Sequence, residues 1–243
     1  AGGGRILVPE ASAPGDWREN MKDLKHLIYF ENLLQEAQNE LILQAQSEGK
    51  VCVAYVCENT PEPLLNLPGA FSTRLRAPRT GSMEMATYYM TSFLCEYSRA
   101  LLERAIEGGY NYLDALLGAE SCATMERMEE HFFLINPVKN PRFFVTQIDP
   151  PMKGDKTNLD YYKAQVKLKI VDELQSRFGV DVSDEAMREA IKDHNEISRI
   201  ITEIGSFRKS DNPNITGYEF HVINLVSQVC PHYLIKPYLE ETL

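Results

Sequence analysis

The clearest pattern in the chain is an almost unbroken apolar run at residues 50–57, Lys-Val-Cys-Val-Ala-Tyr-Val-Cys. It begins after Gly49 and is followed by the turn sequence Glu-Asn-Thr-Pro. A short Val-rich run with these boundaries is typical of a strand that is buried on both faces of a parallel sheet. The pattern therefore predicts a central strand that ends at Cys57, on the edge of the sheet where open α/β folds bind their ligands.

Further strand-like and helix-like segments follow this run in alternation. Residues 71–77, 112–117 and 142–148 predict three more strands, and a short helix is expected after Cys122. A helix is expected from a cap at Thr80 or Ser82 to about residue 107, where a Gly-Gly pair ends it. The hydroxyl pair at 91–92 indicates a break within that helix, close to Cys95.

Helical periodicity dominates the two ends of the chain. Apolar residues among Glu, Gln and Ala predict one long amphipathic helix over about residues 16–47. After residue 151, a capping-box pattern at 157–160 predicts a helix to about 178, and Ser183 predicts the cap of a second helix over about 184–209. A second capping box, Thr216-Gly-Tyr-Glu219, predicts a third helix that ends before Pro231.

This order of elements predicts an α/β fold with a parallel sheet flanked by helices and an all-helical C-terminal extension. The expected segments are a lead-in and helix at 1–48, an α/β domain at 49–151, and a helical segment at 152–243. At 243 residues the chain is long enough to bury a sizeable core.

Composition and charge exclude several classes of function. The net charge of −10 and the pI near 5.1 argue against a nucleic-acid-binding surface. The sequence has no run of 18 apolar residues and no signal peptide at its start, so we expect a soluble cytoplasmic protein without a membrane partner. Five cysteines, an odd number, do not suggest a disulfide framework, and reduced thiols are expected.

Cysteines recur at comparable points of the predicted α/β domain. Cys57 follows the first strand, and Cys122 follows the strand-like residues 112–117. Cys95 lies in the middle of the helix expected to end at about residue 107, near its expected break. Three thiols at one sheet edge are a candidate site for an iron-sulfur cluster. A buried structural thiol is the alternative for each of them, and for Cys122 the two alternatives are equally favoured. Cys52 lies inside the first strand and is expected in the core, whereas Cys230 is expected to have no role.

Charged residues near the first strand offer further chemistry, each with a simpler alternative. Arg74, Arg76 and Arg79 are candidates for binding phosphate or pyrophosphate groups, or else form a solvated basic loop. Glu58 and Glu62 are candidate acid-base groups, although the solvated-turn interpretation is favoured. His131 and His194 lack zinc-ligand spacing with any cysteine, and glycine-rich nucleotide motifs are absent.

Four segments in order resemble the 2-hydroxyacyl-CoA dehydratase and benzoyl-CoA reductase family, which includes the 2-hydroxyglutaryl-CoA dehydratase D-component. They are Tyr55-Val-Cys-Glu-Asn-Thr-Pro-Glu62, Cys95-Glu-Tyr-Ser-Arg99, the stretch from Leu113-Asp114 to Ser121-Cys122, and the tail from His194-Asn-Glu-Ile-Ser-Arg199 through Asn212-Pro-Asn-Ile-Thr-Gly217. The resemblance spans roughly residues 50–230.

The resemblance implies two consecutive Rossmann- or flavodoxin-like domains with a 4Fe-4S cluster between them, of which this chain carries the first domain and the following helices. It implies Cys57 and Cys95 as cluster ligands, with the third ligand either Cys122 or a residue of the second domain. It also implies an acyl-CoA substrate, a related second subunit, and an ATP-dependent activator protein that supplies one electron for a ketyl-radical dehydration.

Three functions remain open at this point. The first is a subunit of a 2-hydroxyacyl-CoA dehydratase, a lyase. The second is a benzoyl-CoA reductase-type subunit that reduces an aromatic acyl-CoA, and the third is a non-catalytic scaffold that retains the domain without half of the cleft.

Overall fold

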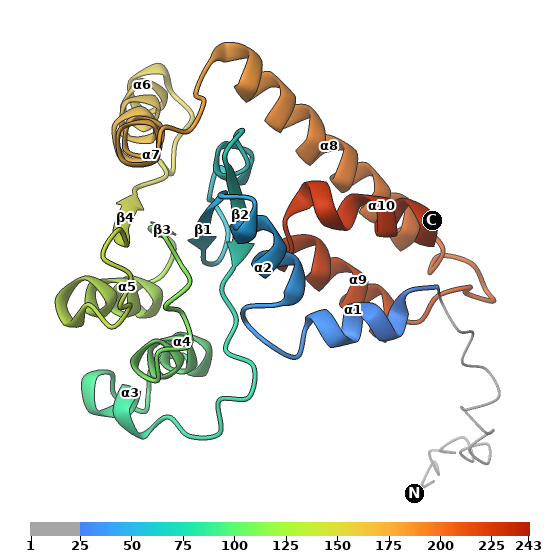
Figure 1. The fold of residues 1–243 in the computed structure, drawn as a ribbon, viewed down its shortest axis with the longest axis horizontal. Helices are drawn as coiled ribbons and strands as arrows, with labels where there is room; N and C mark the ends of the chain where they lie inside the picture. The colour runs from blue at the N-terminus through green and yellow to red at the C-terminus, as the bar shows by residue number, and fades with distance from the viewer. Residues whose placement is uncertain (1–24) are drawn as a thin grey trace, which may run out of the picture.

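A four-stranded parallel sheet forms the centre of the computed structural model, which describes residues 25–243 (Figure 1). The strand order is β2-β1-β3-β4, with β1 (Val51–Tyr55), β2 (Ala70–Arg74), β3 (Ala115–Ala119) and β4 (Phe144–Ile148). All three pairings are parallel. This is the flavodoxin-type order, in which the chain switches direction between β1 and β3. The predicted α/β fold with a parallel sheet is therefore confirmed.

The helices surround this sheet and continue beyond it. In chain order they are α1 (Leu27–Leu33), α2 (Glu40–Ser47), the 3-10 turn η1 (Glu62–Leu65), α3 (Glu84–Tyr89), α4 (Glu96–Ile106), α5 (Ala123–Ile135), α6 (Lys156–Val166), the π-helical turn η2 (Lys167–Val171), α7 (Asp172–Phe178), α8 (Asp184–Ser206), α9 (Gly217–Val229) and α10 (His232–Thr242).

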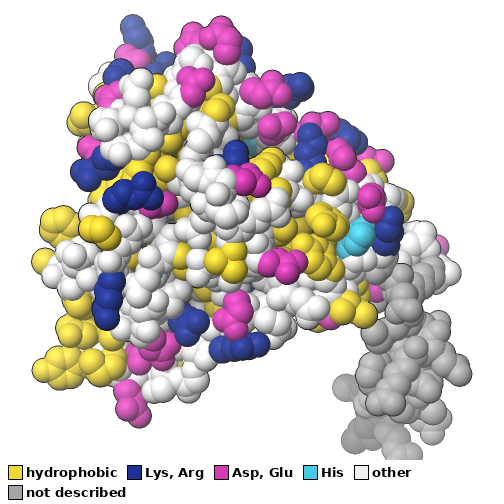
Figure 2. All heavy atoms as spheres, viewed as in Figure 1, with side chains coloured by type: hydrophobic (Ala, Val, Ile, Leu, Met, Phe, Trp, Pro, Cys, Tyr) yellow, Lys and Arg dark blue, Asp and Glu magenta, His cyan; other side chains and the backbone are white. Residues whose placement is uncertain are grey.

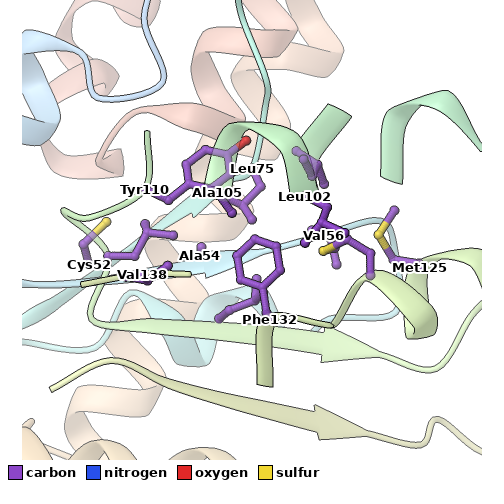
Figure 3. Packing of buried hydrophobic residues seen from close by; sticks show 14 of the residues in the cluster. Cys52, Ala54, Val56, Leu75, Leu102, Ala105, Tyr110, Met125, Phe132 and Val138 are labelled. Atoms are coloured by element: carbon purple, nitrogen blue, oxygen red, sulfur yellow. The ribbon is translucent and has the colours of Figure 1, made fainter. Parts of the chain in front are cut away.

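Each face of the sheet is buried by a different set of helices, because successive side chains of a strand point to opposite faces. Cys52, Ala54 and Val56 pack with residues of α2, α4 and α5, including Leu102 and Phe132 (Figure 3). The alternate residues of β1 pack against η1, η2, α7 and the first turns of α8. Every residue of β1 is consequently buried, as its continuous apolar sequence predicts.

A second core lies beside the sheet, between α1, α8, α9 and α10. The apolar positions of α8 and α9 face inward there, and α1 packs against them from the other end of the sequence (Figure 1). The C-terminal residues 152–243 form helices joined by turns, and none of them belongs to a strand, as predicted. The division at residues 48 and 151 stays a prediction.

The prediction of one long helix over residues 16–47 is wrong for its described part. Two short helices, α1 and α2, are separated by residues 34–39, and residues 16–24 lie outside the described part of the chain. Asn39 begins α2 by accepting the Ile42 N–H at 3.0 Å. The break has a physical reason, because Phe30 packs in the helical core whereas Ile42 packs against the sheet.

The other predicted boundaries are mostly close to those observed. The helix expected over about 83–107 is broken as anticipated, into α3 and α4, and it ends just before Gly108. Ser183 caps α8, and Thr216 and Glu219 form a capping box. The capping box at 157–160 is wrong, since Asp155 caps α6. The third predicted strand, 112–117, lies at 115–119.

Exposed apolar side chains gather on α3, the helix before Cys95. Met85, Tyr88 and Tyr89 of α3 and Phe93 of the following turn are all exposed, Phe93 almost completely. In Figure 2 hydrophobic side chains project from the lower left, over the position of α3 in Figure 1. Within residues 25–243, none of the helices combines the length and the apolar character that crossing a bilayer requires.

Candidate functional site

Cys57 lies just beyond the carboxyl end of β1, where the chain reverses direction. Its φ of 55° is in the left-handed region, which non-glycine residues adopt at a cost of about 1–2 kcal/mol. Asn59, two residues on, is also left-handed. This tight reversal stops β1 and leaves the Cys57 thiol half-buried at the switch point between β1 and β3.

Cys95 occupies the N-cap position of α4 and is exposed. Ser98 Oγ donates to the Cys95 carbonyl at 2.8 Å. Arg99, which is buried, donates to the Leu94 carbonyl at 3.3 Å and to Thr87 Oγ1 at 3.2 Å. These bonds fix the turn between α3 and α4, so the thiol is held by an organised turn even though it is not packed in a core.

Cys122 occupies the N-cap position of α5, directly after β3, and is exposed. Its Sγ lies 3.4 Å from Thr124 Oγ1. That hydrogen bond lowers the pKa of the Cys122 thiol, and the backbone amides of Met125 and Thr124 lower it further. Amides at a helix start favour a thiolate. Packing in a core, one alternative for Cys122, is wrong.

The structure brings these three thiols, all free, to one region. Burial raises the pKa of Cys57, and the neighbouring thiols of Cys122 and Cys95 raise it too, while the Arg74 guanidinium opposes them. Among residues 25–243, no group of three His, Cys, Asp or Glu side chains is arranged for a single metal ion. A cluster is different, because its thiolates bind irons at separate corners. Three free thiols on three elements around one switch point fit that donor set.

Near the cysteines lies a buried carboxyl group, that of Glu129 in α5, which is 3% exposed. Within residues 25–243, neither of its carboxyl oxygens has a hydrogen-bond partner. It packs directly on β3 at Gly118, where an added Cβ would overlap the carboxyl group of Glu129. Burial, together with the nearby charge of Glu126, raises the pKa of Glu129 to about 8. The carboxyl group is therefore mostly protonated at neutral pH.

On the other side of Cys57 the carboxyl ends of β1 and β2 border a cleft of about 420 Å³. Its far wall comes from α8, α9 and α10. Apart from Cys57, the lining consists of Tyr55, Glu58, Glu62, Arg74, His194, Ile197, Ser198, Ile201, Thr202, Asn224, Ser227, Gln228 and His232. The cleft thus combines charged groups, hydroxyls and amides with an apolar strip.

A buried glutamate organises the wall of this cleft. Glu62, in η1, is 8% exposed, and its Oε1 accepts from Asn66 Nδ2 at 2.5 Å and from Ser72 Oγ at 2.7 Å. His232 Nε2 lies 3.1 Å from the same oxygen, and His194 Nδ1 binds Oε2. The solvated-turn interpretation is therefore wrong for Glu62, whereas Glu58 is exposed, as that interpretation expects.

The three titratable groups of this network are shifted in different directions. Burial alone raises the pKa of Glu62, but hydrogen bonds from His194 and Ser72 and the electrostatic attraction of the His232 ring bring it below the ordinary value. The hydrogen bond to Glu62 raises the pKa of His194. Burial lowers the pKa of His232. The arrangement favours an ionised Glu62, a readily protonated His194 and a neutral His232.

The three arginines proposed as a phosphate seat have separate partners. Arg74 Nη1 donates to Gln228 Oε1 at 2.6 Å in the cleft, and Arg76 Nη1 donates to the Leu34 carbonyl at 3.2 Å. Arg79 pairs with Glu36 at 2.6 Å. Of the three, only Arg74 lines the cleft. Binding of CoA phosphates by these residues stays a prediction.

The sequence analysis missed the roles of His194 and His232. Both are remote from Glu62 in sequence, by 132 and 170 positions, and no local pattern links them. His194 belongs to one of the segments that resemble the dehydratase family, and that is the only signal the sequence offers.

Comparison with known proteins gives one family and several relatives. Residues 57–243 match the family described as "2-hydroxyglutaryl-CoA dehydratase, D-component". The chain is 23% identical over 186 residues to the (R)-phenyllactyl-CoA dehydratase beta subunit of Clostridium sporogenes, covering 76% of this chain and 48% of that protein.

Two further relatives have a lower sequence identity to this chain. A benzoyl-CoA reductase subunit of Thauera aromatica is 19% identical over 192 residues, which cover 77% of this chain and 49% of the relative. The beta subunit of lactoyl-CoA dehydratase of Anaerotignum propionicum is 21% identical over 155 residues, which cover 64% of this chain and 40% of that relative. The chain spans about half the length of the curated relatives it matches, or less.

Proposed function

Because the chain belongs to the 2-hydroxyglutaryl-CoA dehydratase, D-component, family, we propose that it acts within a subunit of a 2-hydroxyacyl-CoA dehydratase. Such an enzyme removes water from a 2-hydroxyacyl-CoA. Two relatives are dehydratase subunits by name, one for phenyllactyl-CoA and one for lactoyl-CoA, which supports a thioester substrate. The observation that carries the proposal is the convergence of three free cysteines at the β1/β3 switch point.

In this proposal, Cys57 and Cys95 hold a 4Fe-4S cluster and Cys122 is the candidate third ligand. The cluster would supply the low-potential electron that activates a 2-hydroxyacyl thioester for loss of water. The chain's own part is to present thiolates and orient the substrate. The amides at the start of α5 favour the charged form of Cys122, and Arg74 favours that of Cys57. A protonated Glu129 adds no negative charge beneath them.

The cleft beside Cys57 is the proposed place for the acyl group, since it borders the cysteines and offers both polar and apolar contacts. Glu58, exposed at its rim, remains the candidate acid-base carboxylate from the turn. Arg74, Arg76 and Arg79 remain candidates for the CoA phosphates. The proposal includes a related second subunit, an ATP-dependent activator that delivers the electron, and a cytoplasmic setting.

The cluster proposal is tested by anaerobic reconstitution of cysteine variants, with iron and acid-labile sulfide measured in each. Cys57→Ser and Cys95→Ser are expected to lose most of the iron. The matched control, Cys230→Ala, removes a buried thiol of the helical core and is expected to keep it. Full iron content in the Cys57→Ser/Cys95→Ser double variant would contradict the proposal. Loss of iron in Cys122→Ser would identify the third ligand, and retention would exclude it.

An aryl-CoA reductase is the second candidate, favoured by the relative from Thauera aromatica. The two reactions give different products from different substrates. Incubation with the partner subunit and an electron source is expected to convert a 2-hydroxyacyl-CoA to its unsaturated thioester and to leave benzoyl-CoA unchanged. Reduction of benzoyl-CoA alone would favour the second candidate. A scaffold would hold no cluster and convert neither thioester.

A further inference from the structure

The carboxylate of Glu62 is fully engaged by protein groups. Oε1 accepts hydrogen bonds from Asn66 and Ser72 and lies against His232, and Oε2 binds His194. A carboxylate with both oxygens in use and 8% exposure has little capacity left for a ligand. Glu62 therefore acts on the cleft through the residues it holds.

His194 is the member of this network that reaches the cleft with a free ring nitrogen. Its Nδ1 is bound to Glu62, and within residues 25–243 no protein atom hydrogen-bonds its Nε2. It is only half-buried, in contrast to His232. On α8 it is followed by Ile197, Ser198 and Ile201, which line the same cleft. Residues three, four and seven positions apart share one face of a helix, so this wall is the cleft face of α8.

Among the charged groups on the elements around His194, Glu62 is the one that raises the pKa of its ring. Glu62 of η1 is in direct contact, and Glu58 of the preceding turn adds a second carboxylate at the cleft. Arg74 of β2 lines the cleft but is bound to Gln228. His232 of α10 is kept neutral by burial, and Asp193 is the neighbour on α8 itself.

We propose that His194 Nε2 is the proton-exchanging group of this cleft, binding the hydroxyl or thioester oxygen of a 2-hydroxyacyl-CoA, and that Glu62 is its positioning residue. This inference rests on the proposed function. It goes beyond the proposed function by assigning the acid-base role to a histidine of the C-terminal helices in place of the turn carboxylates Glu58 and Glu62.

One imidazole can both give the proton and take up the proton that dehydration requires. The hydroxyl leaves as water when its C–O bond breaks and it takes up one proton, and the neighbouring carbon loses one proton as the C=C bond forms. The overall reaction is redox-neutral. If His194 Nε2 gives the first proton and accepts the second, the ring ends in its starting state, and the Glu62 carboxylate stabilises the protonated ring throughout. Ile197 and Ile201 offer apolar contact for the acyl chain.

The test is an NMR titration of the histidine rings in the full chain, with lactoyl-CoA and phenyllactyl-CoA as probes and free CoA as the control ligand. The His194 pKa is expected above the ordinary value of about 6.5 in the wild type and to fall in Glu62→Gln. At least one hydroxyacyl thioester is expected to shift the His194 Nε2 resonance, and CoA alone is not. His194→Gln is expected to weaken that thioester's binding about tenfold, and the exposed His221→Gln is the matched control.

Three results would overturn the inference. They are a His194 pKa that is the same in Glu62→Gln, thioester binding that leaves the His194 resonance in place, and absence of binding by both thioesters. A purely structural Glu62–His194 contact would give the second result. Iron content separates this inference from the proposed function. If His194 is unaffected by ligand while the chain still holds its cluster, the inference fails and the dehydratase proposal stands.

Discussion

Two buried glutamates near Cys57, Glu62 in η1 and Glu129 in α5, lie on elements that cover opposite faces of the sheet, and they differ in their partners and in their charge. Glu62, on the cleft side, has four protein partners and a pKa below the ordinary value. Glu129, on the side of Cys122, has no hydrogen-bond partner in the described part of the chain, and its pKa is raised to about 8. Burial disfavours the charge of both, so the difference comes from the partners.

The two charge states suit the two sides of the site. A charged Glu62 is useful at the cleft, where it supports a protonated His194. A charged Glu129 would raise the pKa of Cys57 and oppose the thiolates that a cluster needs. One side of Cys57 is thus an organised proton-binding network. The other is a set of exposed thiols above a neutral carboxyl group.

Removing the Glu62 side chain is expected to have the largest effect. Glu62→Ala leaves Asn66, Ser72 and His194 without their shared acceptor, which costs about 3 kcal/mol of unfolding free energy. Urea unfolding at pH 7 measures it. Glu58→Ala, a change at an exposed position of the same turn, is the control and is expected within about 0.5 kcal/mol of the wild type. Equal stabilities for both variants would show that the Glu62 network contributes little.

The close approach of Glu129 to β3 can be tested at Gly118. Gly118→Ala places a methyl group on the carboxyl group and is expected to cost about 2 kcal/mol by overpacking. Glu129→Ala in the same chain should recover much of that loss, so the two changes are not additive. Gly81→Ala, with open space around its Cβ, serves as control. Additive losses would mean that Gly118 is needed for another reason.

The raised pKa of Glu129 predicts how stability depends on pH. Between the unfolded value of about 4.3 and the folded value of about 8, the folded state binds more protons than the unfolded state. Stability from this group is therefore lost as pH rises through that range. Glu129→Gln should remove this slope and be more stable than the wild type by about 1 kcal/mol at pH 9. Unfolding curves at several pH values measure it, and an unchanged slope would argue against a neutral Glu129.

The smallest expected effect is the pH dependence of stability that Glu62 contributes, which has the opposite sign to that of Glu129. Its lowered pKa means that its contribution is present above the unfolded value and is lost as pH falls through the folded value. Glu62→Gln should therefore flatten the acid limb of the stability curve. Acid limbs that coincide for Glu62→Gln and the wild type would contradict the assigned charge.

Sequence patterns predicted the sheet better than the site. The continuous apolar run of β1 identifies a doubly buried strand, and Thr216 with Glu219 identifies a helix start, because these signals are local. The division into α1 and α2 within the described part of the helix predicted over 16–47 was missed because its apolar residues pack in two different cores, which periodicity does not distinguish.

The candidate site was likewise predicted from the sequence only in part. Cys57 and Cys122, placed after predicted strands, indicated the region where three thiols converge, since parallel strands end at one edge. Cys95 was expected inside a helix, whereas it lies at the start of α4. The partners of Glu62 come from η1, β2, α8 and α10, so only the folded chain brings them together. The neutral state of Glu129 likewise depends on a packing contact with Gly118.

The cysteine side of the switch point is proposed to hold an iron-sulfur cluster, and iron content tests this without any substrate or partner. Iron and acid-labile sulfide are measured in the wild-type chain purified without oxygen, together with its visible spectrum. We expect about four of each per chain and a broad absorption band that is lost in air. Absence of iron after anaerobic reconstitution would contradict binding of a cluster by these cysteines in this chain.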